Sequence, residues 1–257
     1  MTMQPRRCAT VTGAAQGLGR AIALHLLSSG MNVVGADLLG AKLSALKTEV
    51  GKSERFHTVE ADVSTEAGAK SAIDTALRSF GRIDVLVNVA GGSGSIPAHD
   101  IDEITTEVWN RVLAANIGST FLCTRAAVPH MRKAGYGRII NFSSGLARGV
   151  SGKLRTVGCR LAYCSAKGSI EAFTRQLAKD LAGTGITVNA VVPGFILTEP
   201  GASVHDRFQR LSDSEKTFVL GGRKLDELAR PADIADAVAF LASEAAGHVS
   251  GTSLDVG

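Results

Sequence analysis

The sequence has few cysteines, and they do not occur in a metal-binding pattern. The four cysteines include no CxxC pair, and the six histidines form no cluster at metal-ligand spacing. No apolar run near the amino terminus is long enough for a signal peptide, and none elsewhere approaches the length of a membrane span. These absences argue against a metal site, a disulfide-stapled secreted scaffold and a membrane protein. They predict a cytoplasmic protein with free thiols.

The sequence also lacks a tract of one charge. It has 28 lysines and arginines against 24 aspartates and glutamates, and the basic residues are scattered between acidic ones. Nucleic-acid binding normally requires basic residues gathered on one face or along one helix, so no nucleic-acid partner is expected. A net charge of +4 still accommodates a small anionic ligand.

Short apolar, β-branched runs recur along the chain, and longer segments with helical periodicity lie between them. These runs lie at residues 9–11, 32–34, 56–59, 83–88, 138–142, 186–192 and 253–256. This alternation predicts βαβ units and therefore a parallel sheet. We expect an α/β fold across residues 1–257: a single-domain, Rossmann-like doubly wound sheet of about seven strands with helices on both faces.

Three stretches carry no clear periodicity, at 91–102, 145–160 and 194–224. Each of them follows an expected strand. A doubly wound sheet places its ligand crevice beyond the carboxyl ends of the strands. We therefore expect these three segments to surround the binding site.

The first expected strand runs into TGAAQGLG, residues 12–19, at the start of a helical segment. Gly13, Gly17 and Gly19 can permit a tight turn and a close approach of a phosphate to the backbone, with the free amides of the helix facing the anion. The spacing is GxxxGxG rather than the common GxGxxG. By itself the motif is also compatible with an ordinary turn.

Asp37 closes the second expected strand, eighteen residues after Gly19. A carboxylate in this place can accept hydrogen bonds from the ribose hydroxyls of NAD and would repel the extra phosphate of NADP. The turn residue that might have supplied a compensating positive charge is Gln16, and Arg20 lies inside the helical segment. The alternative is a solvated aspartate at a strand end. We predict NAD(H) as the cofactor, with NADP(H) disfavoured.

Further motifs follow in order: NVAG at 88–91, SS at 143–144, YCSAK at 163–167 and PGFILT at 193–198. Together with the glycine turn and Asp37, this series resembles the short-chain dehydrogenase/reductase family in its classical branch. The resemblance runs from about residue 8 to the end of the chain. Any one motif is weak, but their joint occurrence on a βαβ pattern is specific.

The resemblance implies that each of these motifs contributes to a cofactor site. The implied contacts are Gly13, Gln16, Gly17, Leu18, Gly19, Asp37, Asp62, Val63, Asn88, Ala90, Gly91, Tyr163, Lys167, Pro193, Gly194, Ile196 and Thr198. Asp62 and Val63 look like the pair beside the adenine. Ile196 and Thr198 look like the positions that hold the nicotinamide carboxamide. The family usually has a second asparagine where this chain has Val89, which affects only local hydrogen bonding.

Tyr163 and Lys167 are the expected proton-transfer pair. On a helix their side chains leave the same face one turn apart. Lowering the pKa of a tyrosine from about 10 to about 7 requires roughly 4 kcal/mol. One cation at about 4 Å supplies that much only at an effective dielectric of about 20. We therefore expect Lys167 to activate Tyr163 in a partly desolvated crevice. Without the other motifs, YxxxK would be an ordinary surface pair.

The remaining catalytic roles come from the same comparison. Ser144 is expected to fix the substrate oxygen, with Ser143 as the alternative. Asn116 matches the asparagine that holds a proton-relay water, although alone it would be read as a helix-surface amide. Lys167 is also expected to donate hydrogen bonds to the nicotinamide ribose.

The segment between Ser144 and Tyr163 is longer than is usual in the family. It carries Arg148, Lys153, Arg155 and Arg160 and no acid, so it is interpreted either as a basic lip favouring an anionic substrate or as a solvated loop. Cys159 and Cys164 lie close to the tyrosine in sequence and suggest either a redox-sensitive site or simple packing.

These features predict an NAD(H)-dependent oxidoreductase that interconverts a secondary alcohol and a ketone by hydride transfer. The substrate is expected to be a small alcohol or ketone, with an anionic group if the basic segment takes part. One alternative is a 3-oxoacyl-carrier reductase using NADPH, which Asp37 disfavours. Another is a non-catalytic dinucleotide-binding regulatory protein. The resemblance also suggests a homotetramer.

Overall fold

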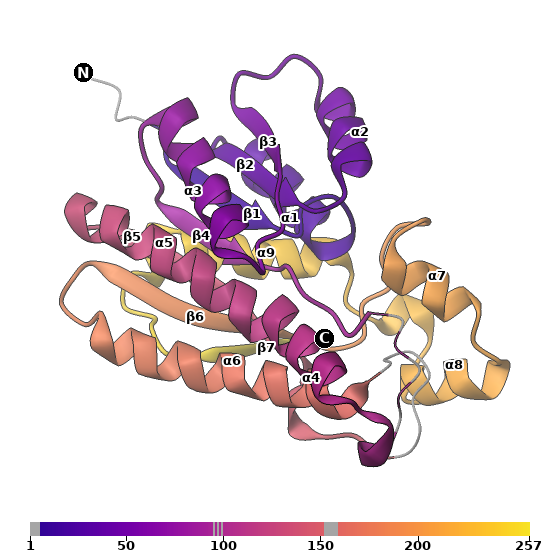
Figure 1. Ribbon diagram of the computed structural model, residues 1–257. Coiled ribbons are helices and arrows are strands. Elements are labelled where there is room, and N and C mark those ends of the chain that lie inside the picture. Colours follow the sequence, from indigo (N-terminus) through magenta and orange to yellow (C-terminus); the bar gives the residue numbers. More distant parts are fainter. Residues whose placement is uncertain (1–5, 95, 97, 99, 152–158) are drawn as a thin grey trace.

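Seven parallel strands form one sheet through the centre of the molecule (Figure 1). The computed structural model describes residues 6–94, 96, 98, 100–151 and 159–257. The strands are β1 (Cys8–Thr12), β2 (Asn32–Asp37), β3 (Phe56–Glu60), β4 (Val85–Asn88), β5 (Gly137–Phe142), β6 (Ile186–Pro193) and β7 (Ser253–Val256). Their order is β3-β2-β1-β4-β5-β6-β7, and every neighbouring pair is parallel. The predicted doubly wound sheet of about seven strands is confirmed.

Helices cover both faces of the sheet. One face is covered by α1 (Gly17–Ser28), α2 (Gly40–Val50) and α9 (Pro231–Ala242). The other is covered by α3 (Glu66–Phe80), α5 (Ser119–Ala134) and α6 (Arg160–Asp180). A short helix, α4 (Thr106–Leu113), continues through a π-helical turn (Ala114–Gly118) into α5. No helix in the described ranges is long and apolar enough to cross a membrane.

The apolar runs became strands because a parallel sheet is buried on both of its faces. Side chains along a strand alternate between faces, so Val33 packs into the core on the α1 side while Val34 packs into the core on the α3 side. Each strand therefore needs apolar residues at successive positions, which produces the near-continuous runs in the sequence.

The segment from 194 to 224 is more regular than expected, because it contains α7 (Ser203–Gln209) and α8 (Asp213–Leu220). In Figure 1 these helices lie together at one side, apart from the helices that cover the sheet. They are short, and they bury few side chains. Helix α8 begins at a capping box, in which the Ser212 hydroxyl accepts from the Glu215 amide. This cap was a signal in the sequence, but the weak amphipathic pattern concealed both helices.

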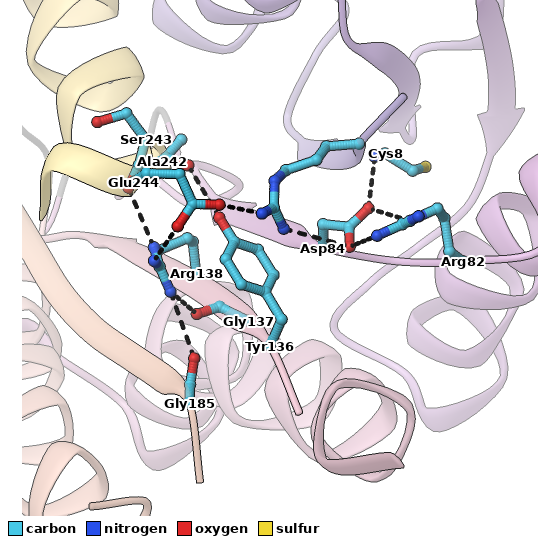
Figure 2. Close-up of polar contacts among 11 residues, drawn as sticks. Cys8, Arg82, Asp84, Tyr136, Gly137, Arg138, Gly185, Ala242, Ser243 and Glu244 are labelled. Carbon is cyan, nitrogen blue, oxygen red and sulfur yellow. Dashed lines mark hydrogen bonds and ion pairs between the residues drawn. The ribbon is translucent and has the colours of Figure 1, made fainter. Parts of the chain in front are cut away.

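A charged network lies at the amino-terminal ends of the strands, which we call the amino edge of the sheet; the carboxyl edge is the opposite one (Figure 2). Asp84, just before β4, is completely buried. Its carboxylate accepts hydrogen bonds from the Cys8 amide at 2.7 Å and from two guanidinium nitrogens of Arg82, each at 2.7 Å. Arg138 on β5 is also buried, and its guanidinium lies 4.3 Å from the centre of the Tyr136 ring. These groups satisfy one another at the edge opposite the carboxyl ends of the strands.

Candidate active site

A cavity of about 950 Å³ opens at the carboxyl ends of the strands. It brings together most of the residues expected at the site. Those that line it are Gly13, Gln16, Gly17, Leu18, Gly19, Asp37, Asp62, Val63, Ala90, Gly91, Ser144, Tyr163, Lys167, Pro193, Gly194, Ile196 and Thr198. Asn88 and Asn116 are not among its lining residues; both are buried behind it. Motifs spread over nearly two hundred residues thus converge on one surface.

The glycine turn joins β1 to α1 at one end of this cavity. Gly13 has φ +68° and Gly17 has φ +60°, a left-handed conformation that favours glycine. A Cβ at Gly19 would lie 1.9 Å from the Gly13 carbonyl oxygen, so the turn and the helix fit together only with glycine there. The Gly17 amide donates to the Glu199 carboxylate at 2.7 Å. A carboxylate therefore takes one of the amides that open α1, a place suited to anions.

Asp37 stands at the end of β2 and lines the cavity beside the glycine turn. Its carboxylate accepts hydrogen bonds from the Ala15 amide at 2.9 Å and the Leu39 amide at 3.0 Å. Arg20 is directed elsewhere, since its guanidinium pairs with Glu49 at 2.5 Å. The end of β2 therefore presents a negative charge to the cavity, held in place by two backbone donors.

Lys42 is a cation that is hydrogen-bonded to the glycine turn. Its ammonium donates to the side-chain oxygen of Gln16 and to the Gly201 carbonyl at 2.7 Å. Gln16 lines the cavity, and its amide nitrogen also donates to the Ser203 hydroxyl at 2.9 Å. The turn is thereby tied to the segment before α7. Sequence reasoning had not identified Lys42, because it lies within α2 without a motif.

Two polar side chains, Thr12 and Asn88, lie beneath the cavity at the start of the loop that follows β4. The Thr12 hydroxyl accepts hydrogen bonds from the amides of Val89 and Ala90, each at 3.1 Å. Asn88 donates to Asn141 on β5 at 2.9 Å and to Thr124 on α5 at 3.2 Å. Asn88 thus supports the loop without reaching the cavity. Thr12, at the head of the glycine motif, is a supporting residue that the sequence analysis did not assign.

Asn116 lies in the π-helical turn between α4 and α5 and is completely buried. Its amide nitrogen donates to the carbonyls of Gly92 at 2.9 Å and Val112 at 2.8 Å, and its oxygen accepts from the Gly92 amide at 3.0 Å. A Cβ at Gly91 would lie 2.4 Å from the Asn116 oxygen. The asparagine side chain therefore clamps the β4 loop, and its expected contact with a proton-relay water stays a prediction.

Ser144, Tyr163 and Lys167 meet at the other end of the cavity. Tyr163 and Lys167 project from α6, and the Lys167 ammonium lies 5.6 Å from the centre of the Tyr163 ring. The same ammonium donates to the Phe142 carbonyl at 2.8 Å. The Ser143 hydroxyl donates to Glu171 at 2.8 Å, whereas Ser144 is the N-cap of the turn that follows β5. Ser144 is thus the serine with its hydroxyl not committed to a carboxylate.

Burial dominates the ionisation of both groups on α6. It raises the pKa of the Tyr163 phenol, and a hydrogen bond with Ser144 and the charge of Arg207 oppose this rise. Burial lowers the pKa of Lys167 to about 8. The expected activation of the phenol by Lys167 stays a prediction; in this structure the Lys167 ammonium is held by the Phe142 carbonyl.

The basic segment before Tyr163 is only partly within the described residues. Lys153 and Arg155 lie outside them. Arg148 does not line the cavity, because its guanidinium forms an exposed ion pair with Asp255 at 2.7 Å. Burial raises the pKa of the Cys159 and Cys164 thiols, which disfavours the reactive thiolate. This supports the packing interpretation of the two cysteines.

Comparison with known proteins places this architecture in a family. The family model described as enoyl-(acyl carrier protein) reductase matches residues 13–257. The short-chain reductase protein NovJ of Streptomyces niveus is 36% identical over 252 residues, which are 96% of this chain and 91% of that protein. The 2-(R)-hydroxypropyl-CoM dehydrogenase of Xanthobacter autotrophicus is 37% identical over 251 residues, 96% of each chain.

Among solved structures, a 3-ketoacyl-(acyl-carrier-protein) reductase from Brucella melitensis, crystallised with NADH, superposes with a TM-score of 0.79. It is 29% identical in sequence, and the match covers 98% of this chain and 97% of that one. The sequence matches and the structural match each cover nearly the whole chain, and the fold they share includes the seven-stranded parallel sheet. The chain belongs to the short-chain dehydrogenase/reductase family of oxidoreductases.

Proposed function

We propose that this protein is an NAD(H)-dependent oxidoreductase that interconverts a secondary alcohol and a ketone. The observation that carries the proposal is the single cavity with Asp37 near one end and Ser144, Tyr163 and Lys167 at the other. The NADH reported with the Brucella melitensis relative and the alcohol named for the Xanthobacter autotrophicus relative support the same reaction class.

The residues present fit a nicotinamide dinucleotide. The Thr198 hydroxyl is buried and makes no hydrogen bond with any described group, at a position expected to hold the nicotinamide carboxamide. At the other end, the Gly17 amide already holds a carboxylate, so the start of α1 accepts negative charge. Asp37 would hold the adenosine ribose, and Asp62 and Val63 would lie beside the adenine. When bound, the nicotinamide accepts hydride from the alcohol carbon or delivers it to the ketone.

In this mechanism the chain supplies the proton transfer that accompanies the movement of hydride. Tyr163 takes the proton of the alcohol in oxidation and returns it in reduction, while the Ser144 hydroxyl donates a hydrogen bond that holds the substrate oxygen. Lys167 holds the nicotinamide ribose and adds positive charge near the phenol. Tyr163 is partly buried in the wall of the cavity, which limits the access of water to this step.

The Tyr163→Phe variant tests the reaction. It keeps the ring but removes the proton carrier, so kcat should fall about 10²- to 10⁴-fold while the Kd for NAD stays close to that of the wild type. Tyr136→Phe is a matched control, because Tyr136 is the only other tyrosine and lies at the opposite edge of the sheet. Steady-state kinetics on a panel of ketones with NADH, with calorimetry for NAD, measures both. Substantial turnover by Tyr163→Phe would sink the mechanism.

The Asp37→Ser variant tests the choice of cofactor. The wild type should use NAD with a kcat/KM at least about tenfold above that for NADP, because the Asp37 carboxylate repels a 2′-phosphate. Asp37→Ser should bring the two values together, mostly through a lower KM for NADP. Equal efficiency of the wild type with both cofactors would contradict the assignment while leaving the proton-transfer roles intact.

A 3-oxoacyl-carrier reductase is the second candidate within the same chemistry, and the Brucella melitensis relative bears that name. Preference for NADPH and for carrier-bound thioesters would identify it. A non-catalytic dinucleotide-binding protein would bind NAD without turning over any member of the panel. The homotetramer and the cytoplasmic location stay predictions, and sedimentation analysis tests the first.

A further inference from the structure

Helix α7 brings a guanidinium to the wall of the cavity on which Tyr163 and Ser144 also lie. This residue is Arg207, which is partly buried. Its Nε donates to the Ser203 carbonyl at 3.1 Å, which fixes the base of the guanidinium against the first turn of the helix. Its two terminal nitrogens form no hydrogen bond or ion pair with any described residue. The fork of the guanidinium is thus held in place and left available.

The position of Arg207 is electrostatically unfavourable without an anion. Burial lowers its pKa, and the phenol of Tyr163 opposes this shift. The same interaction lowers the pKa of the phenol. A guanidinium removed from water normally has a carboxylate or phosphate partner, because desolvation of an unpaired charge costs several kcal/mol. The described residues around Arg207 provide no such partner.

Charges along the cavity are separated by sign. The two acids that line it, Asp37 and Asp62, follow β2 and β3. The charged lining residues from α4, α6 and α7 are all cations: Arg111, Lys167 and Arg207. Low-dielectric walls focus such a field onto whatever enters. The end of the cavity that holds Tyr163 therefore attracts negative charge, while the acids lie at the end proposed for the adenosine.

Apolar side chains complete this positive end. Leu146 and Val150 line the cavity after β5, and Phe218 and Val219 line it from α8. Phe218 is half exposed although it is large and apolar, so it contributes accessible apolar surface at the opening. A ligand that suits these walls has an apolar portion as well as an anionic group.

We propose that Arg207 binds an anionic group of the substrate, so that the protein acts on ketones or secondary alcohols that carry a carboxylate, phosphate or sulfonate beyond an apolar spacer. This inference rests on the proposed function for the reaction at Tyr163. It assigns the specificity to α7, whereas the sequence had suggested the basic segment after β5.

One competing anion is the pyrophosphate of the cofactor, because α7 is tied to the glycine turn through the hydrogen bond from Gln16 to Ser203. The test must therefore separate substrate binding from cofactor binding. The probes are 6-oxoheptanoate and 2-heptanone, which share a methyl ketone and differ in the carboxylate. The variants are Arg207→Met, which keeps much of the apolar length, and Arg207→Lys, which keeps the charge but loses the fork.

Calorimetry with the NAD-saturated enzyme and kinetics with NADH give two independent readouts. Wild-type protein should bind 6-oxoheptanoate about 10- to 100-fold more tightly than 2-heptanone. Arg207→Met should abolish this preference without changing the Kd for NAD, and Arg207→Lys should keep part of it. Arg210→Met is the matched control, because Arg210 is exposed just after α7 and does not line the cavity, so it should behave as wild type.

The outcomes separate this inference from the proposed function. Equal binding of the two ketones, or a preference that survives Arg207→Met, overturns the role of Arg207 even if both ketones are reduced. A weakened Kd for NAD in Arg207→Met assigns the guanidinium to the cofactor and also overturns it. Binding of the acid that depends on Arg207 without any reduction supports the anion site and removes the proposed reaction. If Arg207→Met is insoluble, Arg207→Lys decides: a reduced preference supports the role of Arg207, and an unchanged preference overturns it.

Discussion

At the amino edge of the sheet, Asp84 is fully buried and still has a partner for each carboxylate oxygen, whereas at the carboxyl edge Arg207 is partly buried and has no charged partner among the described residues. The amino edge also pairs Arg138 with backbone carbonyls and with the Tyr136 ring (Figure 2). At the carboxyl edge, the buried Thr198 hydroxyl has no hydrogen bond to any described residue. The charged groups at the amino edge are thus paired within the chain, whereas Arg207 and Thr198 keep polar atoms available to a ligand.

This difference separates stability from function within one sheet. Groups that are paired in the folded chain contribute to its free energy of unfolding and have nothing left for a ligand. Groups that stay unpaired cost stability and can be satisfied only when something binds. Substitutions at the two edges should therefore affect different measurements, and the following variants test that separation.

Asp84→Ala should have the largest effect, on stability alone. It leaves the buried Cys8 amide without an acceptor and removes the partner of Arg82, so the free energy of unfolding should fall by about 3–5 kcal/mol. Urea denaturation measures this loss. The kcat/KM of the folded protein should remain near that of the wild type. Asp226→Ala, at an exposed position, is the control and should change stability by less than about 0.5 kcal/mol. A stable but inactive Asp84→Ala protein would contradict the view that the amino edge contributes to stability and not to catalysis.

Lys167 lies at the carboxyl edge, and its titration should make the free energy of unfolding depend on pH. Its pKa is about 8 when folded, against 10.5 for an unperturbed lysine, so above pH 8 the unfolded chain holds a proton that the folded chain has released. Lys167 alone should therefore add about 1 kcal/mol to the stability between pH 8 and 9, of which the Cys8 and Cys123 thiols offset about 0.7 kcal/mol because they begin to ionise in the unfolded chain. Above pH 9 the stability should fall, because burial raises the pKa of Cys8 and Cys123 from 9.0 to about 12 and the unfolded thiols ionise first.

Lys167→Met isolates this contribution. The variant should lose the rise between pH 8 and 9 and keep the fall above pH 9, since the two thiols are unchanged. Urea denaturation at half-unit pH intervals measures both parts of the curve. An unchanged rise in Lys167→Met would show that another group causes it. Burial of the charged Lys167 would then not lower the free energy of unfolding, which would contradict the comparison of the two edges.

Sequence reasoning worked best where burial on both faces of the sheet dictates residue type. Each strand was visible as a short apolar run, because every position of a buried strand faces a packed layer. The motifs of the cavity were recognisable because glycines and polar residues interrupt that apolar pattern. Such local signals can be recognised without knowing the tertiary contacts of each segment.

The sequence could not supply interactions that depend on long-range placement. Asp84 lies inside an apolar run, and only its position at the sheet edge brings Arg82 and the Cys8 amide to it. Arg207 carries no motif, and it reaches Tyr163 only because α7 folds over the cavity. Arg148 looked like a substrate contact by its closeness in sequence, yet it pairs with Asp255 on β7.

Glu199 offers the smallest and most local test of the comparison, because its carboxylate already binds an amide of the proposed cofactor site. Its carboxylate accepts the Gly17 amide at 2.7 Å, at the end of α1 where a pyrophosphate would be favoured. Glu199→Gln keeps an oxygen for that amide but removes the negative charge, so NAD should bind about two- to fivefold more tightly at low salt. Calorimetry at two salt concentrations measures the change, which should shrink as salt rises. Glu54→Gln makes the same change in charge at an exposed position and should leave the Kd unaltered. Weaker binding of NAD to Glu199→Gln would mean that the carboxylate supports the cofactor site rather than competing for it. The Gly17 amide would then be part of a paired structure, as the groups at the amino edge are, and would not be a position kept free for the cofactor.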